Sequence, residues 1–121
     1  MDHTSIISFL SGSRSAQDFA AEIAPEVEAC IQGCLSDGVG HIVVTDGLVF
    51  TVSRDHAARL LQALADGGLT FDQANYLADS LIMSDDFAFA DADVAEAVAF
   101  VADESRPPTV TETQQALARL A

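Results

Sequence analysis

Apolar residues recur every three or four positions through much of this chain, which is the spacing of one face of a helix. The clearest case runs from Leu69 to Ser105 and predicts two short amphipathic helices joined by an acidic, phenylalanine-bearing turn. Thr70 and Gln73 form a capping box at the start of the first helix, and Asp91 is a suitable N-cap for the second. We expect the rest of the protein to pack behind this stretch.

Three further helices are predicted elsewhere. The first begins after Ser15, and Pro25 gives it either a kink or a fresh start. Its apolar side consists of Phe19, Ile23, Val27, Ile31 and Leu35. The other two begin after Ser53 and Thr109, where the spacing of polar residues is typical of helix N-termini. Residues 4–10 fit a short helix or an edge strand equally well.

The segment from His41 to Val52 predicts a β-hairpin. Asp46 and Gly47 lie between two β-branched runs, which is typical of a two-residue type I′ turn that pairs Val43 with Phe50 and His41 with Val52. Because an isolated hairpin is marginal in water, a third strand, flanking helices or a second copy paired through the hairpin edge must cover it. The predicted fold is α+β, predominantly α-helical with five to six helices and one central antiparallel β-hairpin, in a single domain over residues 1–121.

The charge of the chain restricts its partners. It has 121 residues with 19 acids, five arginines and no lysine, and its net charge is −14. Residues 66–121 hold eleven acids and two arginines, a net charge of −9, so the negative charge concentrates around the two-helix stretch. Without a cluster of basic residues, nucleic acid and anionic membranes are not expected as partners. The electrostatic field of so negative a protein would attract a basic protein partner.

No feature of the sequence indicates a cofactor, a metal or a catalytic reaction. P-loop, nucleophile-elbow and dinucleotide-binding motifs are missing. Cys30 and Cys34 lie four residues apart on one predicted helix, too far for an unstrained disulfide, and are most simply core thiols. For zinc, His3 and His41 are the only further ligands to consider, at a spacing that matches no zinc pattern. The acidic start, the lack of a long apolar run and the two cysteines predict a cytoplasmic protein. The missing catalytic motifs predict that it is not an enzyme.

An acidic rim that contains aromatic residues is the remaining candidate site. The expected partner-binding residues are Tyr76, Asp79, Asp85, Asp86, Asp91, Asp93 and Glu96. Tyr76 would act as an aromatic anchor, ringed by carboxylates that steer a basic partner. Phe87 and Phe89 are either core residues of the helical hairpin or part of an exposed anchor.

The run Leu60–Ser105 contains the acidic turn LADSLxxSDDF followed by an acid-bearing helix, and this run resembles small acidic bacterial proteins of the toxin-immunity kind. The resemblance implies tight binding of a cognate toxin, with carboxylates filling a basic cleft such as that of a nuclease. We therefore predict a non-catalytic protein-binding domain, of the immunity or inhibitor type, that masks a basic site on its partner. A structural or regulatory homodimer and a Cys/His metal or redox protein remain the alternatives.

Overall fold

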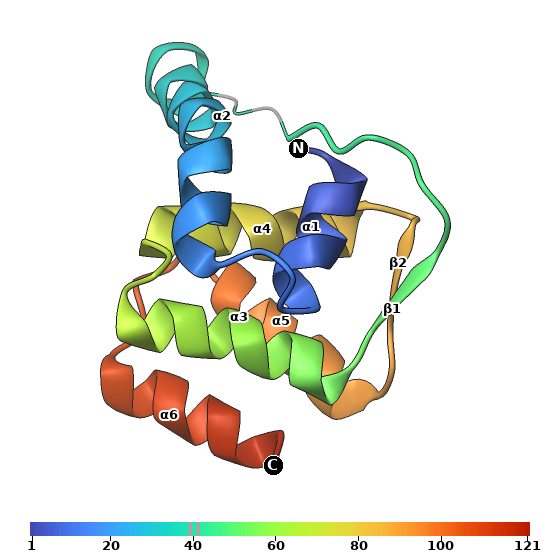
Figure 1. Ribbon diagram of the computed structural model, residues 1–121. Coiled ribbons are helices and arrows are strands. Elements are labelled where there is room, and N and C mark those ends of the chain that lie inside the picture. The colour runs from blue at the N-terminus through green and yellow to red at the C-terminus, as the bar shows by residue number, and fades with distance from the viewer. Residues whose placement is uncertain (39, 41) are drawn as a thin grey trace.

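Six helices and a two-stranded parallel sheet form the part of the chain that the computed structural model describes, residues 1–38, 40 and 42–121 (Figure 1). In chain order the elements are α1 (His3–Leu10), α2 (Ala16–Asp37), β1 (Phe50–Val52), α3 (Arg54–Asp66), α4 (Phe71–Met83), β2 (Phe87–Phe89), α5 (Ala92–Ala102) and α6 (Val110–Arg119). None of the described helices combines the length and apolar composition that crossing a bilayer requires.

Helices begin where the sequence predicts because side chains satisfy their free backbone N–H groups. In five helices the N-cap side chain accepts a hydrogen bond from the backbone N–H three residues later. These N-caps are Ser15, Ser53, Thr70, Asp91 and Thr109. Residues 4–10 belong to α1, which Asp2 caps, and α2 continues through Pro25 as a single helix.

The core lies where α1, α3, α4 and α5 meet. Helix α4 packs against α5, and α3 packs against α1, α5 and α6. The rings of Phe9 and Phe19 stack with their centroids 4.8 Å apart and join α1 to α2. Phe87 is buried with its ring against His3, and Phe89 is half-buried against the same core. Both phenylalanines of the acidic turn are therefore core residues.

The predicted antiparallel hairpin is wrong, and with it the predicted fold class. Strand β1 pairs in parallel with β2, with Phe50 opposite Phe87 and Val52 opposite Phe89. Parallel strands need a long crossover, which α3 and α4 supply here. Neither Asp46 nor Gly47 has the positive φ that both central residues of a type I′ turn need. The expected pairing of His41 lies outside the described residues.

Residues 42–49, here called the strap, bond to α1 instead of folding back on β1. The Thr45 N–H donates to the Met1 carbonyl at 2.9 Å, and the His3 N–H donates to Thr45 Oγ1 at 2.9 Å. His3 Nε2 donates to the Leu48 carbonyl at 3.0 Å, because a carbonyl can only accept. The hairpin edge that would have paired two copies is thus not formed among the described residues.

Gly47 is needed for a close approach to His3. An added Cβ at Gly47 would overlap the His3 ring, which is itself buried. We predict that Gly47→Ala lowers the free energy of unfolding by about 2 kcal/mol, the usual cost of overpacking. In a His3→Ala background the same change should cost at least about 1 kcal/mol less, because the ring has gone. Urea unfolding of the four proteins checks this, and strictly additive costs would contradict the contact.

Candidate functional site

The structure separates the seven predicted partner-binding residues into two places. Tyr76 and Asp79 lie on α4, on its side toward α2. The other five follow one another from the end of α4 through β2 into α5, and are Asp85, Asp86, Asp91, Asp93 and Glu96. The seven residues therefore do not form one continuous surface around an exposed ring.

Most carboxylates of the second place have partners within the chain. Asp86 Oδ2 accepts a hydrogen bond from the Gly47 N–H at 3.2 Å. Arg54 bridges two acids, with its Nε 3.1 Å from Asp91 Oδ2 and its Nη2 2.7 Å from Asp93 Oδ2. The hydrogen bond from the Val94 N–H, and then Arg54, keep the pKa of Asp91 below its usual value. These acids hold the strap, the start of α5 and the start of α3 together.

Tyr76 is a structural link between α4 and α2. Its side chain is buried, and its hydroxyl donates to Glu26 Oε2 at 2.9 Å. The same oxygen lies 3.0 Å from the amine of Met1, so three segments meet at Glu26. Burial, and then Glu26, raise the pKa of Tyr76 far above its usual value. Tyr76 therefore cannot serve as the exposed anchor that the sequence predicts.

An open groove of about 350 Å³ lies between the C-terminal half of α2 and α4, and we call it the acidic groove. Its wall is made of apolar side chains, two thiols and three carboxylates. The lining residues are Val27, Cys30, Ile31, Cys34, Leu35, Gly40, Ile42, Phe71, Asp72, Asn75, Tyr76, Asp79 and Glu104. Of the predicted partner-binding residues, it brings together Tyr76 and Asp79.

The apolar floor of the acidic groove continues the apolar stripe of α2. Phe19, Ile23 and Val27 are buried, but Ile31 is only half-buried and Leu35 is 75 % exposed. The cause is the length of α2, whose 22 residues carry its C-terminal half above the other helices (Figure 1). A helix face that remains apolar beyond the core is surface available for a partner.

Two carboxylates are held close together at the edge of this floor. Asp79 is half-buried, and its pKa is raised to about 6 by burial first, and then by the charge of Glu104 and a hydrogen bond to it. Asp72 adds a third negative charge on the first turn of α4. None of the five arginines lines the acidic groove. Its negative charge is therefore not neutralised by a neighbouring arginine.

The prediction that Cys30 and Cys34 are core thiols is wrong, because Cys30 is half-buried and Cys34 is exposed where α2 extends beyond the core. Both thiols lie next to the backbone of Gly40. An added Cβ there would be 2.6 Å from the Cys30 sulfur and 2.7 Å from the Cys34 sulfur. Burial, and then the neighbouring Cys34, raise the pKa of Cys30, which disfavours the thiolate that redox or metal chemistry needs. Within the described ranges, no three His, Cys, Asp or Glu residues gather closely enough to hold a metal. His3 is bonded to the strap, and His41 lies outside those ranges.

Sequence reasoning missed Glu104, Ile31 and Leu35 as site residues. The apolar stripe of α2 extends to Leu35 on a helix of 22 residues, and this length could have indicated that part of the stripe lies beyond the core. Nothing local in the sequence places Glu104 beside Asp79, because that contact joins the end of α5 to α4.

Comparison with protein-family models, curated proteins and solved structures gave no match for this chain. The resemblance to toxin-immunity proteins thus gains no support from a relative. The role of the acidic groove is therefore argued from its own geometry and charge.

We predict that Asp79→Asn stabilises the protein at pH 7. The pKa of Asp79 is about 6 in the folded protein and 3.8 ordinarily, so the folded state binds the proton more tightly. Stability from this group is therefore present below pH 4 and lost as the pH rises toward 6. With solvent screening allowed for, the variant should gain about 1–2 kcal/mol in the free energy of unfolding at pH 7.

Urea unfolding at pH 7 and below pH 4 checks this prediction. Glu96→Gln is the matched control, because it removes one charge from an exposed position of α5, outside the acidic groove. Equal stabilisation by the two variants at pH 7 would mean that only the net charge matters. A gain for Asp79→Asn that persists unchanged in acid would also contradict the assignment.

Proposed function

We propose that this protein is a non-catalytic binding module that uses the acidic groove to hold a basic, amphipathic segment of a protein partner. One observation carries the proposal. The apolar stripe of α2 continues out of the core through Ile31 to Leu35, into a groove whose carboxylates have no arginine beside them. At this one place, apolar side chains lack a packing partner and carboxylates lack a neighbouring positive charge.

The chemistry of the groove specifies its ligand. Aliphatic side chains of a helix or extended segment would pack on Ile31 and Leu35. A lysine or arginine on the same segment would reach Asp79 and Glu104, whose mutual repulsion it would relieve. Such a cation favours the ionised form of Asp79, so binding should release a proton near pH 6.

The sharpest form of this function is that of an immunity or inhibitor protein. A net charge of −14 would steer a basic partner, such as a nuclease toxin, toward the protein at long range. Exposed acids outside the acidic groove, Asp85 and Glu96 among them, would serve in this steering. Both cysteines are free, which fits an action in the cytoplasm.

Binding of a synthetic amphipathic helix with a leucine face and a lysine face, followed by fluorescence anisotropy, tests the proposal. The double variant Asp79→Asn/Glu104→Gln should weaken binding at least about tenfold. The matched control Asp85→Asn/Glu96→Gln removes the same charge outside the groove and should change the affinity less than about threefold. Leu35→Ser, which alters no charge, should also weaken binding.

Three results would contradict the proposal. Equal weakening by the two double variants would show that only net charge attracts the peptide. Equal binding of a peptide with every lysine replaced by glutamate would exclude recognition of a basic segment. A wild-type dimer, seen by light scattering and dissociated by Leu35→Ser, would assign the groove to a second copy of this chain.

A further inference from the structure

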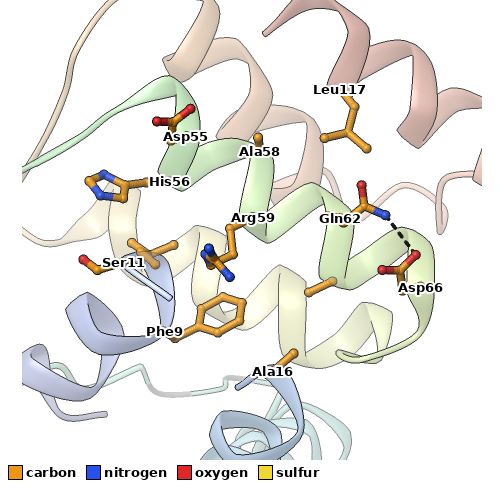
Figure 2. A pocket seen from close by; sticks show the side chains of 12 residues that line it. Phe9, Ser11, Ala16, Asp55, His56, Ala58, Arg59, Gln62, Asp66 and Leu117 are labelled. Carbon is orange, nitrogen blue, oxygen red and sulfur yellow. Dashed lines mark hydrogen bonds between the residues drawn. The ribbon is translucent and has the colours of Figure 1, made fainter. Parts of the chain in front are cut away.

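A second, larger groove lies on the α3 side of the molecule and shares no residue with the acidic groove. Its volume is about 700 Å³, within the range of pockets that hold small molecules. It runs over α3 between the end of α1 and α6 (Figure 2). Phe9, Leu10 and Ala63 line it but are buried, so Ala16, Ala58 and Leu117 supply its accessible apolar surface, and Arg59 projects into it from α3.

Arg59 is available for a ligand. Arg14, Arg54 and Arg106 each form an ion pair, whereas Arg59 forms none with any acid in the described part of the chain. Asp66, the acid farther along the same face of α3, instead accepts a hydrogen bond from Gln62 Nε2 at 2.9 Å (Figure 2). Arg59 thus shares a groove with Asp55 and Asp66 and forms an ion pair with neither.

The guanidinium group of Arg59 lies next to the loop after α1. Gly12 has a φ of +86°, which favours glycine, and an added Cβ there would lie 2.7 Å from Arg59 Nη2. The guanidinium therefore lies against bare backbone, where a side chain at this position would displace it.

His56 adds a second donor one helical turn before Arg59. The Ser53 N–H donates to His56 Nδ1 at 3.0 Å, so Nδ1 accepts and the proton of the neutral ring is on Nε2. His56 also lines the groove, and its Nε2–H takes part in no hydrogen bond among the described residues. The groove thus offers a guanidinium and an imidazole N–H beside an apolar wall.

We propose that this groove binds a small organic carboxylate with an apolar tail. The planar guanidinium of Arg59 would pair with both carboxylate oxygens, and the tail would lie against the half-buried side chains of Ala58 and Leu117. Asp55 and Asp66 also line the groove, so a ligand with one negative charge, paired directly with Arg59, is repelled less than a ligand with two. A phosphate dianion would face Asp55 and Asp66 in the same groove with too little positive charge to balance it.

Octanoate is the probe, titrated into the full chain and followed by calorimetry and backbone amide NMR, with n-octanol as the uncharged comparison. We expect octanoate to bind wild type about tenfold more tightly than octanol, the value of one charge-assisted pair. Arg59→Gln should abolish that preference while octanol binding stays unchanged. Arg119→Gln is the control, because Arg119 also has no ion pair among the described residues and lies outside the groove.

Four results would overturn the assignment. They are no saturable octanoate binding, equal affinity for octanoate and octanol, octanoate binding that survives Arg59→Gln, and equal weakening by Arg59→Gln and Arg119→Gln. Arg59 is exposed, so Arg59→Gln is expected to fold, which its thermal unfolding curve checks. Because the two grooves share no residue, failure here would leave the peptide-binding proposal untouched, and the reverse also holds.

Discussion

The parallel pairing of Phe50–Val52 with Phe87–Phe89 decides the path of the chain. Strand β1 takes β2 as its partner, and the described residues before it do not return along it as an antiparallel strand. They cross the molecule as the strap, held by α1 at Thr45 and Leu48 and by Asp86 at Gly47 (Figure 1). The buried rings of His3 and Phe87 pack together and join these segments, so the N-terminal helix closes the fold.

The same path leaves the C-terminal half of α2 with few partners. Gly40 and the strap residues Ile42 and Val43 lie beside α2, and the buried part of its apolar stripe ends at Val27. The stripe beyond it stays open, next to the carboxylates of Asp79 and Glu104. Repulsion between these two acids destabilises the folded protein, and a neutral residue in place of one of them would remove it. Functional sites commonly keep such destabilising arrangements.

Local signals predicted the helices well and the topology poorly. The capping residues Ser53, Thr70 and Thr109 begin helices as expected because a cap satisfies groups within four residues of itself. The hairpin turn predicted at Asp46–Gly47 did not form, because the strap bonds to the N-terminus and to Asp86 after α4. Such contacts between distant segments cannot be predicted from neighbouring residues. Acidity was visible in the sequence. Which acids bind Arg54, which hold the strap and which remain in a groove depends on contacts between distant segments.

The account depends on one claim, that apolar contact and charge act together at the C-terminal half of α2 and the facing side of α4. Backbone amide NMR with the basic amphipathic peptide tests it most directly, because every residue reports separately. We expect the largest shift changes at Ile31, Leu35, Asn75 and Asp79. Changes spread evenly over all exposed acids, or concentrated from Asp85 to Glu96 with α2 unaffected, would contradict it.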